Sequence, residues 1–150
     1  MTCETHVNEI TALIKSYLDA YQHRDIDALA AVVANDDKFV AFGTDESEVW
    51  LGWEEFKSAS EKLFGAMDEI HWDREKTQRI NFSRDGNTAW FVEELTGNFL
   101  TGGEKHTCDF RFSCVCEKRD GSWKIVQFHR SVPAEEHAVP YLETHGVRFD

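Results

Sequence analysis

The spacing of apolar residues changes near residue 68, and this change constrains the fold more than any other feature. Before that point apolar residues recur every three or four positions, which is the period of an amphipathic helix. After it they alternate every second residue, which is the period of a strand. Helices followed by strands are typical of an α+β domain, with the helices packed on one face of an antiparallel sheet. A chain of 150 residues suffices for one such domain and needs no disulfide or structural metal to fold.

Three helices are predicted in the first half. The first covers residues 5–23, the second is short and follows Asp25 as its N-cap, and the third covers about residues 52–67. A short strand is expected at residues 39–42. The apolar stripe of the first helix comprises Val7, Ile10, Leu13, Ile14, Tyr17, Leu18 and Tyr21.

The second half predicts four strands, at residues 69–82, 87–100, 105–118 and 123–132. The turns between them carry Gly86, Gly102-Gly103 and Gly121, so consecutive strands form hairpins and the sheet is an antiparallel meander. We expect one domain over residues 1–133. Residues 134–150 form a C-terminal tail that is expected to pack on the domain or on a partner subunit.

The formal net charge of −12 bears on possible partners. Nucleic acid and anionic membranes repel such a chain, and no Lys/Arg-rich run offsets the repulsion. Residues 1–9 are polar and lack the apolar core of a signal peptide. No apolar run approaches the roughly 20 residues of a membrane span. The sequence therefore predicts a cytoplasmic protein that binds neither nucleic acid nor membrane and keeps its four cysteines reduced.

Several segments resemble a known group of proteins. Residues 17–21 (Tyr-Leu-Asp-Ala-Tyr) and 25–29 (Asp-Ile-Asp-Ala-Leu) resemble the first two helices of the nuclear-transport-factor-2-like superfamily, which includes ketosteroid isomerases and SnoaL-like polyketide cyclases. Residues 120–131 resemble the closing strand of its SnoaL-like branch, which also contains the association (hub) domain of calcium/calmodulin-dependent kinase II. Residues 42–45 and 52–56 fit the same branch.

The resemblance implies a fold and an assembly. The fold is a cone-shaped, curved antiparallel sheet packed against three N-terminal helices, with a cavity between the concave face and the helices. The assembly is a homodimer through the outer sheet face.

The resemblance also implies a pocket protein that binds a small, largely apolar organic ligand without a cofactor. It leaves open whether this ligand is turned over by an isomerase-, cyclase- or dehydratase-type reaction. A non-catalytic oligomerisation module like the kinase hub, or a ligand carrier or sensor, are the alternatives. Steroid isomerisation is not expected, because similar isomerases carry an Asp base on the first short strand. Here residues 39–42 contain no carboxylate.

Three residues are predicted to carry chemistry. Matching the strands to the hub pattern places Glu94 and Arg130 inside the cavity, and Tyr17 occupies the position of a hydrogen-bond donor on the first helix. Glu94 is then an acid/base candidate and Arg130 an anion-holding group. Alternatively, Glu94 and Arg130 form a buried ion pair in which each neutralises the other, with a structural role alone. The predicted ligand-binding residues are Phe56, Trp90, Val92, Phe110, Phe112, Cys114 and Phe128.

Other chemistry-bearing residues are interpreted structurally. Cys114 and Cys116 share a strand face without a matching His, so core packing is expected and no metal site. His129 is expected on the outer face, together with Trp123 and Ile125, as a dimer-interface residue. The acidic segment 45–48 (Asp-Glu-Ser-Glu) is predicted to form a solvated turn, and a role for His71 is left open.

Overall fold

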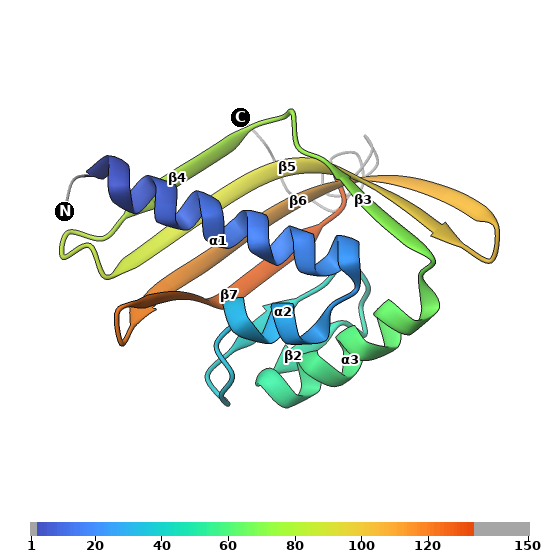
Figure 1. Ribbon diagram of the computed structural model, residues 1–150, viewed down its shortest axis with the longest axis horizontal. Coiled ribbons are helices and arrows are strands. Elements are labelled where there is room, and N and C mark those ends of the chain that lie inside the picture. Colours follow the sequence, from blue (N-terminus) through green and yellow to red (C-terminus); the bar gives the residue numbers. More distant parts are fainter. Residues whose placement is uncertain (1–2, 134–150) are drawn as a thin grey trace, which may run out of the picture.

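The structure is a computed structural model that describes residues 3–133, and its helices lie where the sequence predicts them (Figure 1). They are α1 (Cys3–His23), α2 (Ile26–Val32) and α3 (Trp53–Ala66). The side chain of Asp25 accepts a hydrogen bond from the Ala28 N–H at 3.0 Å, which confirms it as the N-cap of α2. The predicted tail at 134–150 lies outside the described residues. Within residues 3–133 no helix is long and apolar enough to cross a membrane.

The sheet has seven strands within the described residues. They are β1 (Val40–Phe42), β2 (Val49–Leu51), β3 (Glu69–Asp73), β4 (Gln78–Phe82), β5 (Thr88–Thr101), β6 (Glu104–Arg119) and β7 (Ser122–Ser131). Their order is β2-β1-β7-β6-β5-β3, and β4 pairs with β5 beside β3. The predicted meander is confirmed for β5, β6 and β7, but β1 runs parallel to β7, so the sheet is mixed.

The strand predicted at 69–82 is two strands. β3 pairs with residues 96–100 of β5, and β4 pairs with residues 89–93. The polar residues Arg74, Glu75, Lys76 and Thr77 separate them. The sheet bends between its two halves and curls around α1, which lies across its concave face (Figure 1).

Aromatic side chains fill the space between α1 and the sheet. Tyr17 of α1 stacks on Phe112 of β6 with ring centroids 5.4 Å apart. Phe128 of β7 packs against Phe56 of α3 at 5.2 Å and against Phe39 at 5.9 Å. All five rings are almost fully buried, so the cone has an aromatic core rather than a wide empty interior.

A β-bulge changes which face β7 presents to the core. The register between β6 and β7 shifts at Val115/Cys116, because β7 carries one more residue than its partner there. As a result Trp123 and Ile125 are buried together with Phe128. The prediction that Trp123 and Ile125 share the outer face with His129 is therefore wrong. His129 itself is exposed on the outer face, as expected.

Candidate functional site

Arg130 of β7 lies at the centre of the candidate site. Its position two residues beyond Phe128 directs it to the concave side, where its guanidinium carbon lies 5.0 Å from the Phe128 ring centroid. The rings of Tyr21 and Trp50 lie 5.4 and 5.9 Å from the same carbon. Its Nε is buried and has no hydrogen-bond partner within residues 3–133. A cation held among three aromatic rings, with a buried donor unsatisfied, is a binding group for an acceptor or anion.

Arg130 borders two hollows on the concave side. The larger is a cavity of about 250 Å³ at the open end of the cone, which we call the mouth cavity. The smaller lies deeper, against α1 and the sheet, and holds about 10 Å³, roughly the room for a single water. The mouth cavity is lined by Tyr21, Ser47, Glu48, Trp50, Phe56, Ala59, Ser60, Lys62, Leu63 and Arg130. The deep hollow is lined by Tyr17, Leu18, Trp72, Leu95, Phe110, Phe112 and Arg130.

A second unsatisfied donor borders the deep hollow. The indole Nε1 of Trp72 is buried and, like Arg130 Nε, has no hydrogen-bond partner among the described residues. A buried N–H without an acceptor costs about 1–3 kcal/mol. Trp72 and Arg130 therefore both border the deep hollow, and each carries a buried donor without a partner.

Tyr17 lines the deep hollow rather than the mouth cavity, and its hydroxyl contacts Tyr21. Its hydroxyl donates to the Tyr21 hydroxyl at 3.3 Å, and its ring is almost fully buried. Burial, followed by the interaction with Tyr21, raises the pKa of Tyr17 well above its usual value, so it stays a neutral phenol. Because Tyr21 accepts from Tyr17 and borders the mouth cavity, its own O–H is the group placed to donate there.

The charge of Arg130 is secure. Burial alone lowers the pKa of Arg130, but interactions with Tyr21, Tyr17 and Glu48 outweigh that effect and leave the pKa above the usual arginine value. The guanidinium is therefore cationic throughout the physiological range.

Glu48 is a site residue that the sequence did not predict. Residues 45–47 are exposed, as expected for a solvated turn, but Glu48 is half-buried and lines the mouth cavity. Glu48 reaches the site because β1 pairs with β7, which places the β1–β2 turn beside Arg130. No sequence period reveals that pairing, because β1 and β7 are far apart in the chain.

The ten predicted residues fall into four groups. Arg130 and Phe56 line the mouth cavity, and Tyr17, Phe110 and Phe112 line the deep hollow. Cys114 and Phe128 are buried in the core behind them. Trp90, Val92 and Glu94 are exposed on the outer face of the sheet, so the prediction that they line the cavity is wrong.

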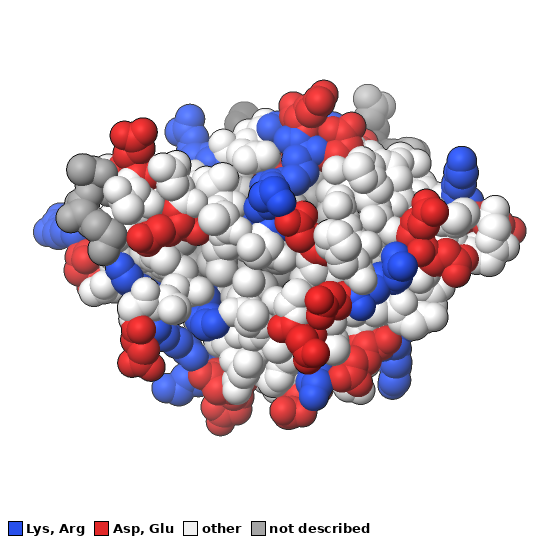
Figure 2. Space-filling model, viewed as in Figure 1, with Lys and Arg blue, Asp and Glu red and all other residues white. Residues whose placement is uncertain are grey.

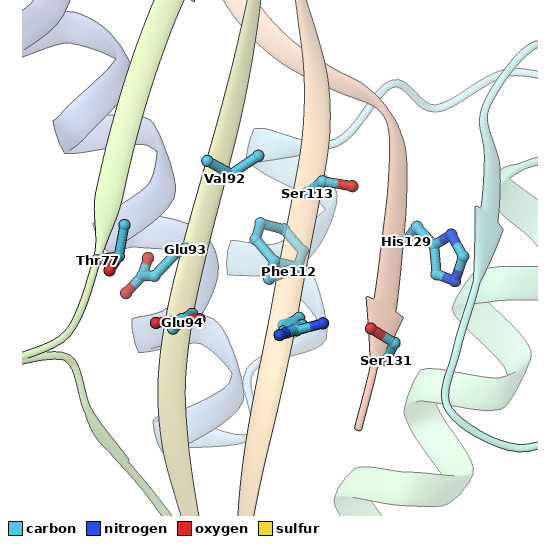
Figure 3. Close-up of a pocket in the computed structure, with 9 residues that line it drawn as sticks. Thr77, Val92, Glu93, Glu94, Phe112, Ser113, His129 and Ser131 are labelled. Atoms are coloured by element: carbon cyan, nitrogen blue, oxygen red, sulfur yellow. The ribbon is translucent and has the colours of Figure 1, made fainter. Parts of the chain in front are cut away.

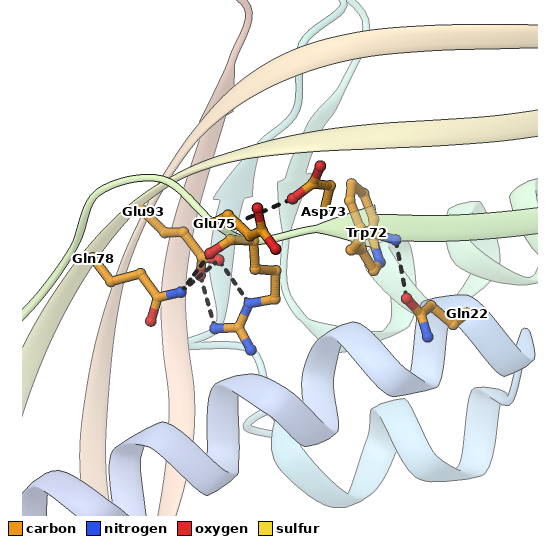
Figure 4. Close-up of polar contacts among 7 residues, drawn as sticks. Gln22, Trp72, Asp73, Glu75, Gln78 and Glu93 are labelled. Atoms are coloured by element: carbon orange, nitrogen blue, oxygen red, sulfur yellow. Dashed lines mark hydrogen bonds and ion pairs between the residues drawn. The ribbon is translucent and has the colours of Figure 1, made fainter.

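The correction follows from the pairing of β5 with β6. Phe91 lies opposite Cys114 and Glu93 opposite Phe112, so the odd-numbered residues of this part of β5 share the concave face. Glu94 therefore cannot pair with Arg130 inside the cone. Glu93 is the carboxylate on the concave face, and both of its oxygens bind Arg74, at 2.7 and 3.0 Å (Figure 4). This pair satisfies itself and tethers the segment between β3 and β4.

On the outer face Glu94 lies in a separate hollow of about 280 Å³. Figure 3 shows Glu94, Ser113 and His129 extending from three neighbouring strands around it. Arg111, directly opposite Glu94 on β6, also borders it. Within residues 3–133 neither Glu94 nor Arg111 forms an ion pair, so this hollow is bordered by an unpaired carboxylate and an unpaired guanidinium.

Cys114 and Cys116 lie in the core, where the sequence analysis expects them. Cys114 and Cys116 are buried with their sulfurs 3.8 Å apart, as core packing predicts. Among residues 3–133 no group of three His, Cys, Asp or Glu side chains is placed to hold a metal ion. On the face shown in Figure 2, Lys and Arg side chains are interspersed with Asp and Glu.

This architecture, a curved sheet closed by three helices with a cavity at its open end, defines a nuclear-transport-factor-2-like domain. The chain belongs to the SnoaL-like domain family, whose model matches residues 10–135. Among curated proteins none matches the chain.

Solved structures show the same fold at low sequence identity. A nuclear-transport-factor-2-like superfamily protein from Salmonella enterica serovar Typhimurium is 19% identical, with 91% of this chain and 97% of that one covered and a TM-score of 0.82. A Xanthomonas campestris protein, described as a calcium/calmodulin-dependent protein kinase II association domain, is 23% identical over 85% of this chain and 87% of its own, with a TM-score of 0.73. A Novosphingobium aromaticivorans protein, described as a scytalone dehydratase, is 14% identical over 87% and 85%, with a TM-score of 0.77.

Proposed function

We propose that this protein binds a small organic acid with an apolar body in the mouth cavity, and that Arg130 holds the acid group. The observation that carries the proposal is that Arg130 lines the mouth cavity while its buried Nε lacks a hydrogen-bond partner in the described chain. The rings of Tyr21, Trp50 and Phe56 supply the apolar wall for the rest of the ligand. The volume, about 250 Å³, lies just below the roughly 300–1,000 Å³ of sites for drug-sized ligands, which favours a smaller molecule.

Binding is tested with 3-phenylpropanoate and its uncharged amide, by isothermal titration calorimetry and by NMR chemical-shift changes. The acid is expected to bind, and Arg130→Met to weaken it by about 10- to 100-fold, because hydrogen bonds to a charged group contribute about 1.5–3 kcal/mol. The amide is expected to bind more weakly. Arg111→Met on the outer face is the matched control and leaves the affinity unchanged. Equal affinity of wild type and Arg130→Met refutes the proposal.

Acid–base turnover at this cavity depends on residues other than the predicted Glu94. The carboxylate that borders the cavity is Glu48, and the hydroxyl placed to donate is that of Tyr21. An isomerase- or lyase-type reaction in this protein would therefore use Glu48 and Tyr21, with Arg130 stabilising the developing anion. The four unpaired cysteines support a reducing compartment such as the cytoplasm as the place of action.

We also propose a homodimer through the outer sheet face. Phe42, Trp90 and Val92 are 51%, 44% and 46% exposed on this face, more than a solvated sheet requires. The free Glu94 and Arg111 are complementary, so a twofold arrangement can pair each with its counterpart on the second copy. Trp90→Asp is expected to give a monomer, measured by light scattering. Ser58→Asp, on the exposed side of α3, is expected to leave the dimer intact. A monomeric wild type contradicts this assembly.

A non-catalytic oligomerisation module is the second candidate function. The small volume of the deep hollow, about 10 Å³, favours it, because aromatic packing has closed most of the cone. Native mass spectrometry distinguishes the two candidates: a closed ring larger than a dimer supports the module.

A further inference from the structure

The mouth cavity holds a fixed negative group as well as the positive one. Glu48 and Arg130 both line it, yet within residues 3–133 they form no ion pair with each other. Opposite charges that share a partly enclosed cavity without touching leave room between them for a ligand that contacts both. Arg130 has its unsatisfied Nε, and Glu48 has one oxygen that accepts no hydrogen bond in the described chain.

The position of Glu48 is built into the turn. Its Oε2 accepts from the Thr44 N–H at 2.8 Å, and the Gly43 N–H donates to the Glu48 carbonyl at 2.8 Å. The carboxylate lies so close over Gly43 that a Cβ on residue 43 would stand 1.7 Å from Oε2. Glycine at 43 is therefore required for Glu48 to fold back in this way. A solvated glutamate on a loop needs no such arrangement.

The charge of the whole protein favours a ligand that carries both signs. A simple carboxylate approaches a chain of net charge −12 against long-range repulsion, whereas a zwitterion does not. Once inside, an ammonium group has a negative partner in Glu48, which lines the same cavity as Arg130.

We propose that the mouth cavity recognises a small zwitterion with an apolar body, whose carboxylate binds Arg130 and whose ammonium group binds Glu48. This inference rests on the proposed function and names its ligand class. Glu48 is then a specificity-determining residue, and Gly43 is a positioning residue that acts through Glu48.

The test compares phenylalanine with 3-phenylpropanoate, which share the ring and the carboxylate and differ in the ammonium group. Wild-type protein is expected to bind phenylalanine about 10- to 100-fold more tightly, the gain expected of a hydrogen bond between charged groups. Glu48→Gln reduces this ratio to about one by removing the negative charge. Gly43→Ala reduces it as well, although Glu48 is still present, because the new methyl group displaces the carboxylate.

The control is Glu46→Gln, which removes the same charge from the exposed part of the same turn and keeps the ratio. If 3-phenylpropanoate binds through Arg130 but phenylalanine binds no more tightly, the zwitterion inference is wrong and the proposed function stands. If Glu46→Gln lowers the ratio as much as Glu48→Gln, the effect is long-range and the inference is also wrong. If neither compound binds wild-type protein, both the inference and the proposed function fail.

Discussion

The buried pair of Arg74 and Glu93 makes an asymmetric prediction about stability. The Glu93 side chain is 0% exposed, whereas that of Arg74 is 24% exposed. When Arg74 becomes Met, the carboxylate stays inside with only the Gln78 amide near it, at 3.5 Å. When Glu93 becomes Leu, the remaining guanidinium can turn toward water. Removing the arginine is therefore expected to cost more than removing the glutamate.

The magnitudes follow from burial. Leaving a buried charge without its partner costs about 3–5 kcal/mol, which we expect for Arg74→Met. Glu93→Leu loses the hydrogen bonds but buries no charge, and about 1–2 kcal/mol is expected. The double variant is expected to cost about as little as Glu93→Leu alone, so the two substitutions couple strongly. For a domain of this size the arginine variant lowers Tm by about 6–20 °C.

Urea unfolding at pH 7, followed by tryptophan fluorescence and far-UV circular dichroism, measures these differences. Protein concentration is held constant, because a dimer makes the midpoint concentration-dependent. Lys76→Met is the control: Lys76 binds Asp109 with both side chains about half exposed, and such pairs contribute about 0–1 kcal/mol. The reasoning is refuted if Arg74→Met costs no more than Glu93→Leu, or if the double variant is as unstable as the sum of the two.

Three further measurements test other parts of the structure. Phe112→Ala is expected to lower the free energy of unfolding by about 3–5 kcal/mol, because it opens a cavity in the aromatic core; a loss below 1 kcal/mol in urea contradicts that packing. The hydrogen bond from Arg119 lowers the pKa of Asp36, so its stabilisation is complete above the ordinary carboxyl pKa of about 3.9 and is lost as pH falls through the lower folded value. Asp36→Asn should flatten the acid limb of urea midpoints measured from pH 7 to pH 3, and an unchanged limb argues against the pair. The hydrogen bond between Cys114 and Cys116, then burial, raises the pKa of Cys114. The two buried thiols, Cys114 and Cys116, should therefore react with a disulfide reagent only on unfolding, and four fast thiols in the native protein would disprove this.

The elements with strong local signals could be predicted from the sequence. The helical stripe of α1, the Asp25 cap and the glycine turns are each determined by neighbouring residues, and the structure confirms all three. Asp120 and Gly121, with φ of 50° and 80°, adopt the left-handed pair that a two-residue hairpin turn requires. The parallel pairing of β1 with β7 has no such local signal, because it joins residues that are distant in the chain.

The concave face of β5 could not be decided from alternation alone. Trp90, Val92 and Glu94 are no less apolar as a set than Phe91, Glu93 and Leu95, so both faces satisfy a strand with one buried side. The register with β6 settles the question, since it places Phe91 opposite Cys114. Each face of β5 carries one acidic residue, Glu93 or Glu94. Only Glu93 has a cationic partner, Arg74, which reaches it from the segment between β3 and β4.

The β-bulge in β7 explains why the face of Trp123 and Ile125 was predicted wrongly, and it also positions Arg130. A strand that alternated strictly could not bury both Ile125 and Phe128, since one of them would face solvent. The extra residue lets the first half of β7 close the core against α1 while the second half carries Arg130 to the mouth cavity. Removing that extra residue by deleting Val126 would force a choice between a buried Ile125 and an inward Arg130. Stability and ligand binding therefore depend on the same irregularity, which alternation in the sequence does not reveal.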